Sequence, residues 1–262
     1  MSVLTATSWS QLHELIFTDS WDTGIQRHRS RHAFRGLSDH SYKLDSGLMR
    51  LGGPYLQLEG HLLRNFKKYA HKSIVERDSL WHWLSVAQHH GLPTRLLDWT
   101  YSPLVAMHFA TCGLDSYDTD GAIWVVDYAK AHNILPQNVR QPLQREGAQV
   151  YTVEMLSETV GSLKDLDSLS SPQNDFALFF EPPSLDDRIV NQFAYFSVLS
   201  RADLAMDDWL TLHPGLWKKI IIPKDLKWEV RDKLDQSNIT ERVLFPGLDG
   251  LSQWLKRHYT PR

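Results

Sequence analysis

Several features that define common protein classes are scarce or missing in this chain of 262 residues. It has a single cysteine, Cys112, which excludes an internal disulfide and a cysteine-based zinc site. No apolar run approaches the roughly 18–20 residues that a membrane helix needs, and the first residues lack the pattern of a secretory signal. We therefore expect a cytoplasmic protein that does not associate with membranes.

The sequence also lacks low-complexity stretches, a clear internal repeat and a linker rich in Gly, Ser and Pro. We predict one domain over residues 1–262, with residues 1–26 as an N-terminal helical extension. There is no Gly-x-Ser-x-Gly, no Walker loop and no Gly-x-Gly-x-x-Gly, which argues against a serine hydrolase and the common nucleotide-binding loops.

What the chain does contain is material for a folded core, because 42% of its residues are hydrophobic and 23% are charged. Apolar spacing and capping residues predict helices over residues 8–17, 55–75, 78–89, 102–110 and 224–235. Strands are expected over residues 32–36, 44–49, 122–127, 175–181, 193–199 and 217–222. This irregular mixture favours a single α+β domain with a mixed or antiparallel sheet.

Residues 88–100 (QHHGLPTRLLDWT) form the most informative segment, because they are polar yet lie between two apolar helices. Buried polar groups must be paired inside the fold, and such a concentration often marks a site. One alternative is that Arg95 and Asp98 merely brace a turn. Another is a metal-dependent nuclease with His82, His89, His90 and Asp98 as ligands, although adjacent histidines on a helix point in different directions.

The same segment, together with Phe34-Arg35-Gly36 and residues 102–110, resembles the FRG domain family, which is named for its Phe-Arg-Gly motif. The resemblance continues through Glu181-Pro182-Pro183, residues 188–196 and residues 244–251. It implies a mostly bacterial or phage-related protein.

A remoter resemblance, to the ADP-ribosyltransferase superfamily, implies an NAD site built from three motifs and a sheet core of that superfamily with added helices. The first motif is an early-strand arginine, Arg35, which would grip a phosphate or ribose of NAD. The second is a strand leading into a helix, residues 94–110, where Trp99 or Tyr101 would stack on the nicotinamide. The third is a late strand with a carboxylate, whose position is held here by Gln192.

Gln192 is a departure that matters, because an amide can hydrogen-bond a ribose hydroxyl but supplies no negative charge and accepts no proton. Asp98 and Glu181 are the acids that would replace the missing carboxylate. The alternatives are an acceptor nucleophilic enough to need no base at this position, and loss of activity. A further departure is Ala194, where the family tends to have Gly. The expected catalytic residues are Arg35, Thr94, Asp98, Glu181 and Gln192. The expected NAD-binding residues are Phe34, Arg35, Gly36, His89, Thr94, Arg95, Trp99, Thr100, Gln192 and Phe196, with no metal.

The net charge of −3 conceals two segments of opposite sign. Residues 27–77 carry eleven Lys or Arg against four Asp or Glu, whereas residues 111–208 carry six against sixteen. A basic face around Arg35 would attract NAD or a polyanion such as RNA. The acidic half would suit a basic antitoxin.

We therefore expect a toxin or phage-defence effector that transfers ADP-ribose from NAD to a macromolecule, with RNA ahead of DNA and protein. A non-catalytic nucleotide-binding or interaction module is the main alternative, and a metal-dependent nuclease is a second one.

Overall fold

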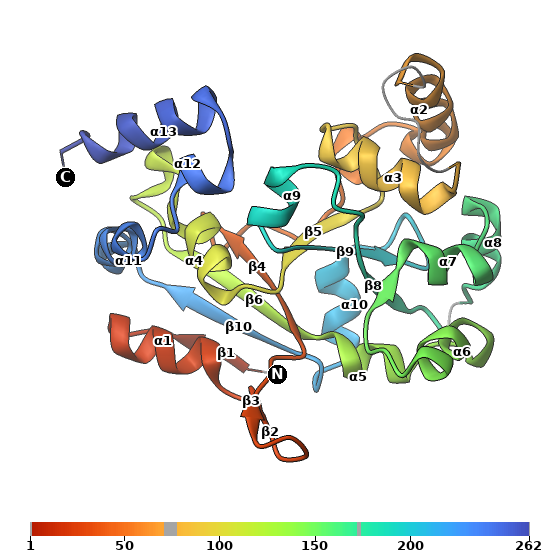
Figure 1. Ribbon diagram of the computed structural model, residues 1–262, viewed down its shortest axis with the longest axis horizontal. Helices are drawn as coiled ribbons and strands as arrows, with labels where there is room; N and C mark the ends of the chain where they lie inside the picture. Colours follow the sequence, from red (N-terminus) through yellow and green to blue (C-terminus); the bar gives the residue numbers. More distant parts are fainter. Residues whose placement is uncertain (1, 71–77, 172–173, 262) are drawn as a thin grey trace.

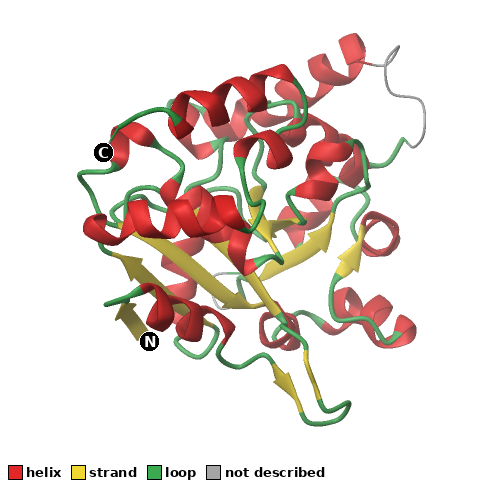
Figure 2. Cartoon of the chain, turned by 60° about the vertical axis from the view of Figure 1, so that its left-hand side comes forward, coloured by secondary structure: helices red, strands yellow, loops and turns green. Residues whose placement is uncertain are grey.

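An eight-stranded mixed sheet runs through the residues that the computed structural model describes, 2–70, 78–171 and 174–261, with helices on both faces (Figure 1, Figure 2). In spatial order its strands are β1 (Ser2–Thr5), β10 (Trp217–Ile222), β6 (Gly121–Asp127), β4 (His32–Leu37), β5 (Leu97–Thr100), β9 (Ala194–Leu199), β8 (Ala177–Glu181) and β7 (Tyr151–Thr152). The predicted α+β class with one mixed sheet is confirmed.

The strand pairing contains one weak point, between β4 and β5. Neighbouring strands are antiparallel except for the two edge pairs, β1 with β10 and β7 with β8. β4 is paired with β6 along six residues, but it meets β5 at a single pair, Phe34 with Thr100. The sheet therefore opens next to this pair. A separate hairpin, β2 (Trp21–Asp22) and β3 (Arg27–His28), precedes β4.

Several helices begin where a short polar side chain caps the chain. Ser8, Ser79 and Ser102 each accept a hydrogen bond from the third amide of the helix that follows, which satisfies an otherwise unpaired donor. The helices are α1 (Trp9–Phe17), α2 (Tyr55–Ala70), α3 (Leu80–His89), α4 (Pro103–Thr111), α5 (Tyr128–Asn133), α6 (Gln137–Glu146), α7 (Val153–Thr159), α8 (Leu163–Ser168), α9 (Asp187–Asn191), α10 (Met206–Leu212), α11 (Lys224–Gln236), α12 (Glu241–Leu244) and α13 (Leu248–His258).

Side-chain alternation along the strands divides the core into three clusters. One face of the sheet packs against α5 and α10 in a single cluster that includes Trp99, Trp124 and Phe179. On the other face, α1, α4 and α11 cover β10, β6 and β4, whereas α3, α7 and α8 cover β8 and β9. The two groups of helices on this second face leave the region over β5 between them, and a cavity lies there.

The helical extension expected over residues 1–26 is wrong in part: it contains α1, but β1 is an edge strand of the main sheet and β2 belongs to the separate hairpin. The strand expected over residues 44–49 is also wrong. Leu44, Ser46 and Leu48 alternate in burial as a strand would, but they belong to a loop that leads into a 3-10 turn, Met49–Leu51. The amide of Leu44 donates to a side-chain oxygen of Asp207, and that of Leu48 to the carbonyl of Thr94, so no ladder forms.

Two other expectations concern the length of helices. The helix expected over residues 55–75 is observed as α2 to Ala70, and residues 71–75 lie outside the described part of the chain. Within residues 2–70, 78–171 and 174–261, no helix combines the length and apolar character that a membrane crossing requires.

Candidate functional site

A cavity of about 1080 Å³ lies over the opening between β4 and β5. Its walls come from the Phe-Arg-Gly residues of β4, the end of α3 with its following turn, β5, α9, the start of β9 and the segment after α12. Parts of the chain that are far apart in sequence thus converge on one space. Its polar lining residues are Arg35, Arg50, Gln88, His89, His90, Asp98, Thr100, Asp186, Asp187, Arg188 and Gln192.

The three residues of the Phe-Arg-Gly motif have three different tasks. Phe34 is buried among α4, β6 and β10 and anchors the strand in the core. Gly36 lies so close to α4 that an added Cβ would come within 1.9 Å of the carbonyl oxygen of Ala106. Only glycine fits there without moving the helix, so the motif holds α4 directly against β4 and leaves Arg35 for the cavity.

Arg35 enters the cavity where the β4–β5 ladder has ended. Its Nη1 donates to the backbone carbonyl of Asp98, and the same nitrogen lies 4.0 Å from Asp98 Oδ2. Burial lowers the pKa of Arg35 and Asp98 partly opposes this, but a guanidinium remains charged in proteins. Its Nε has no hydrogen-bond partner among the described residues. The side chain is therefore a fixed cation with donor capacity to spare.

Gln88 links the side chains of the 88–100 segment. Its Nε2 donates to Asp98 Oδ2 at 2.9 Å, while its Oε1 accepts from the hydroxyl of Thr94 at 2.6 Å. The Thr94 oxygen in turn accepts from the amide of Leu96. The Asp98 side chain is still 60% exposed, so this carboxylate is oriented from behind and open toward the cavity.

His89, at the end of α3, makes a hydrogen bond across the cavity wall to Asp186, the residue that caps α9. His89 Nε2 lies 2.7 Å from Asp186 Oδ2, and the other carboxylate oxygen accepts from the amide of Ile189. Burial would raise the pKa of Asp186, but the hydrogen bonds from Ile189 and His89 outweigh it and keep the pKa below its ordinary value. The cavity thus contains a histidine held by an ionised carboxylate.

Gln192 lines the cavity, but its amide is engaged. The side-chain Nε2 of Gln192 donates to the backbone carbonyl of Leu244 at 2.9 Å. The backbone carbonyl of Gln192 accepts from the Thr100 hydroxyl at 2.8 Å. The next residue, Phe193, has φ +50, a left-handed conformation that is costly for a bulky side chain and is often found near functional sites. The Gln192 side chain therefore clamps α12 to the end of α9.

Residues 30–119 match the family model of the FRG domain. The chain contains an FRG domain. This stretch supplies β4, α3, β5 and α4, and with them Arg35, His89 and Asp98 of the cavity. No curated protein and no solved structure matches the chain.

The segments after residue 119 in which we predicted further FRG resemblance lie outside the match. α9, β9 and Gln192 are therefore joined to the FRG motifs by the fold alone. The likeness to ADP-ribosyltransferases remains a prediction.

Three residues expected in the NAD site do not line the cavity, namely Thr94, Arg95 and Glu181. Thr94 is buried, and its hydroxyl donates to Gln88 and accepts from the backbone amide of Leu96. Glu181 is exposed at the end of β8. Of the two acids proposed to replace the missing carboxylate, only Asp98 meets Arg35 and Gln192 in one space.

Arg95 lies inside the domain, in a structural ion pair. Its Nε and Nη2 bind the two carboxylate oxygens of Glu59 at 2.7 and 2.5 Å, and Nη1 binds Asp167 at 2.7 Å. Burial lowers the pKa of Arg95, but Glu59 and then Asp167 more than compensate and raise it above its ordinary value. The suggestion that Arg95 and Asp98 brace a turn is wrong in its pairing, since Arg95 joins α2 to α8.

The aromatic residues expected to stack on nicotinamide have different surroundings. Trp99 is among the residues that line the cavity, but its side chain packs in the cluster on the opposite face of the sheet. It is 4% exposed, and its Nε1 donates to the Ser197 hydroxyl. Tyr101 is 46% exposed, contacts Phe193 and Tyr195, and is not a lining residue. Core packing explains Trp99 without a ligand.

The sequence reasoning missed the charged residues that α9 brings to the cavity, Asp186, Asp187 and Arg188, as well as Arg50. A signal was present, because an Asp followed by an Asp–Arg pair after Pro182-Pro183 is a typical helix start. No group of three or more His, Cys, Asp or Glu suited to a metal occurs within the described ranges, and His89 is already paired with Asp186.

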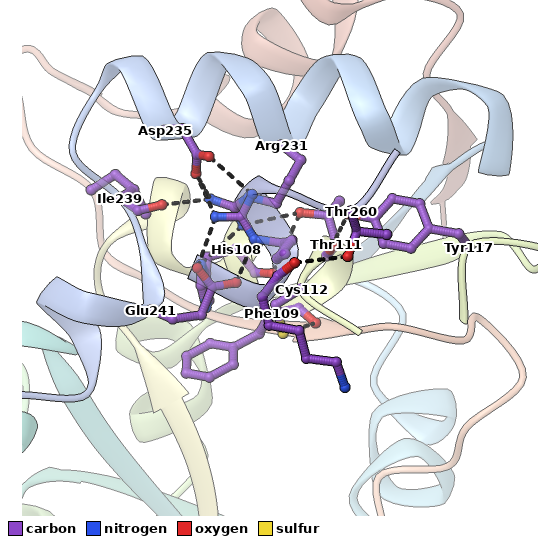
Figure 3. Close-up of polar contacts among 12 residues, drawn as sticks. His108, Phe109, Thr111, Cys112, Tyr117, Arg231, Asp235, Ile239, Glu241 and Thr260 are labelled. Atoms are coloured by element: carbon purple, nitrogen blue, oxygen red, sulfur yellow. Dashed lines mark hydrogen bonds and ion pairs between the residues drawn. The ribbon is translucent and has the colours of Figure 1, made fainter. Parts of the chain in front are cut away.

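A buried charge network fixes the C-terminal wall of the cavity (Figure 3). Arg257 of α13 binds Asp235 of α11 and Glu241 of α12, with its shortest contact, Nε to Glu241, at 2.6 Å. Arg231 binds Asp235 and donates to Nδ1 of His108 on α4. Burial and then Arg231 hold the pKa of His108 at about 3. α12, whose last carbonyl binds Gln192, is thereby fastened to the FRG part of the fold.

The basic segment of the sequence does not form one face. The β2–β3 hairpin and α2 lie at separate corners of the molecule (Figure 1, Figure 2), and Arg35 and Arg50 are the members of this segment that line the cavity. The basic face expected around Arg35 does not include α2, because no residue of this helix lines the cavity.

Proposed function

We propose that this FRG-domain protein binds NAD in the cavity at the β4–β5 opening and transfers its ADP-ribose to RNA, as a toxin or phage-defence effector. The observation that carries the proposal is the convergence of Arg35, Asp98 and Gln192 on one cavity of about 1080 Å³. Arginine and carboxylate side chains from separate strands meet there although 63 residues separate Arg35 from Asp98.

The chemistry of the transfer fits these side chains. Arg35 is a fixed cation that lines the cavity, which suits the pyrophosphate of NAD. When nicotinamide leaves, the ribose acquires oxocarbenium character, and a carboxylate held nearby stabilises that charge. Asp98 is such a carboxylate, because Gln88 and Arg35 orient it and its side chain remains open to the cavity.

RNA is the acceptor that the surface charge favours. The β2–β3 hairpin carries Arg27 and Arg29, neither of which has a carboxylate partner among the described residues, and Trp21, which is 54% exposed. Cations beside an exposed aromatic ring suit a single strand, since bases stack on the ring and phosphates bind the cations. The chain runs from this hairpin directly into β4 and Arg35.

The test is to incubate the purified protein with NAD labelled in its adenylate part and, separately, with RNA, single-stranded DNA and cell protein. We expect label on RNA and release of nicotinamide. We expect Arg35→Ala to lower the rate by about 100-fold, the value of one or two charge-assisted hydrogen bonds. Arg145→Ala is the matched control, because Arg145 pairs with Glu146 and Glu158 on the surface and does not line the cavity.

A non-catalytic nucleotide-binding module is the second candidate, and the engaged amide of Gln192 favours it. In that case NAD binds, Arg35→Ala weakens binding, and no nicotinamide is released. If the label is found on DNA or protein instead of RNA, that molecule is the acceptor and RNA is not. If the protein neither binds nor cleaves NAD, both functions are refuted.

A further inference from the structure

The pair formed by His89 and Asp186 is not needed to bind a phosphate, yet it lies in the wall of the same cavity as Arg35. The two residues come from different helices, 97 positions apart in the chain, and their side chains meet at 2.7 Å. The His89 side chain is 8% exposed, whereas that of Asp186 is 47% exposed. A carboxylate that holds an imidazole in this way is the arrangement by which enzymes orient a general base.

The hydrogen bond also fixes which nitrogen of His89 is free. An ionised carboxylate only accepts hydrogen bonds, so the proton of the neutral ring must sit on Nε2, which leaves Nδ1 as the basic nitrogen. Nδ1 has no hydrogen-bond partner among the described residues and is not among their fully buried unpaired atoms. Asp186 is itself held in place by the Ile189 amide.

The other candidates for this task are less suitable. Gln192 cannot accept a proton, and its amide is bound to Leu244. Asp98 is already engaged, because it accepts a hydrogen bond from Gln88 and lies 4.0 Å from Arg35, and its proposed task is to stabilise the charge of the ribose. His89 is thus the cavity residue whose free nitrogen and oriented ring best match proton transfer.

We propose that His89 is the general base of the transfer reaction, that Asp186 is its positioning residue, and that the acceptor is a hydroxyl group. The proposal rests on the function proposed above. As the glycosidic bond between the ribose C1′ and nicotinamide breaks, nicotinamide leaves with the bonding electron pair. The acceptor oxygen forms the new bond to C1′, and its proton passes to Nδ1 of His89. The imidazolium that forms is stabilised by Asp186 and returns the proton to solvent.

Other charged groups line the cavity around His89. The ring of His90 lies 5.2 Å away, edge to face, at the end of the same helix. α9 contributes Asp186, Asp187 and Arg188 to the same lining, β5 contributes Asp98, and β4 and the loop before α2 contribute Arg35 and Arg50.

The experiment compares His89→Ala, Asp186→Asn and the control His61→Ala in the full-length protein. His61 is an exposed residue of α2, outside the cavity. Asn caps a helix about as well as Asp, so Asp186→Asn preserves the start of α9. Its NH2 group then faces His89 Nε2 as a donor, which favours the ring tautomer with its proton on Nδ1. Nicotinamide release and RNA labelling are measured from pH 5 to 9, and NAD affinity is measured by calorimetry.

We expect His89→Ala to lower kcat about 100-fold or more, the usual value of a general base, with the NAD affinity changed less than about threefold. In this variant the fall of kcat at low pH should disappear. Added imidazole should restore part of the rate by occupying the space that the side chain vacates. Asp186→Asn should lower kcat by a similar factor, because the proton then occupies Nδ1, and His61→Ala should match the wild type.

If the rate of His89→Ala is within threefold of the wild-type rate, His89 is not the general base. The same conclusion follows if a weaker NAD affinity explains the whole loss of rate. An unchanged pH profile without imidazole rescue also refutes the general base, because a structural histidine would lower the rate at every pH. In each of these cases the wild type still cleaves NAD, and the proposed function stands. A wild type that does not cleave NAD overturns both proposals.

Discussion

Gly36 is the residue at which the FRG motif can be tested most directly, by replacement with alanine. The added Cβ would lie 1.9 Å from the Ala106 carbonyl oxygen and 2.7 Å from the Ala110 amide nitrogen. Real Cβ atoms are essentially never closer than 3.0 Å to such atoms, so α4 must withdraw from β4 by about 1 Å or more. Both contacts are backbone atoms, and a rotation of side chains cannot relieve them.

The cost follows from what α4 buries. Ala106, Met107 and Ala110 are completely buried against β4, β6 and β10, and protein interiors have few voids to absorb a shift. We expect Gly36→Ala to lower the free energy of unfolding by about 3 kcal/mol, the upper part of the range for overpacked cores. The neighbouring Arg35 should also lose its position over Asp98, so NAD binding should weaken.

Gly60→Ala is the matched control. Gly60 is inside α2, and a Cβ built there meets nothing within 4 Å. Because alanine favours a helix interior more than glycine, this change should stabilise the protein by about 0.5–1 kcal/mol. The assay is urea unfolding of both variants, followed by circular dichroism and tryptophan fluorescence. A Gly36→Ala variant within about 0.5 kcal/mol of the wild type would refute the close-packing role of the motif glycine.

The buried pair of Arg95 and Glu59 should be sensitive to Glu59→Gln, which leaves a buried cation incompletely paired and should cost about 3–5 kcal/mol in urea unfolding. Asp167→Asn, on the half-exposed side of the same arginine, should cost less than about 1 kcal/mol, and equal losses would contradict the assignment. Acid should destabilise the fold well above the pKa of its carboxylates, because burial holds the pKa of His108 at about 3 and that of His132 at about 4. Both rings stay neutral when folded but are protonated below pH about 6.5 when unfolded, so each removes about 1.4 kcal/mol of stability per pH unit as the pH falls from 6.5 toward 4. Stability that is constant between pH 6.5 and 4.5 would argue against this.

Local patterns predicted helices α1, α2, α3, α4 and α11 and strands β4, β6, β8, β9 and β10, but they did not predict β1, β7 or the other helices. Ser8, Ser79 and Ser102 mark helix starts, and Gly91 ends α3 with φ +80, as capping rules predict. The pattern failed over residues 44–49, because alternate burial of Leu44 and Leu48 is produced by a loop packed into the core. Alternation reports which side chains are buried and does not report whether the backbone pairs.

The candidate site was predicted in part, since nine of the expected NAD-site residues line the cavity: Phe34, Arg35, Gly36, His89, Asp98, Trp99, Thr100, Gln192 and Phe196. Arg95 was expected to bind NAD, but it pairs with Glu59 and Asp167. Sequence does not separate these cases, because a buried ion pair and a ligand site both use charged side chains. Its partner Glu59 is 36 positions away on α2, and nothing local in the sequence connects them.

The sequence by itself determined the α+β class, the helix boundaries set by caps, and the Phe-Arg-Gly and 88–100 segments as the centre of interest. These depend on neighbours along the chain, where periodicity, capping and motif composition act. Only the tertiary structure decided that β4 and β5 separate after one residue pair, that Asp98 rather than Glu181 joins Arg35, and that Asp186 orients His89. Those facts depend on contacts between strands and helices that are distant in sequence, and their geometry is set by how two groups of helices pack on one face of the sheet.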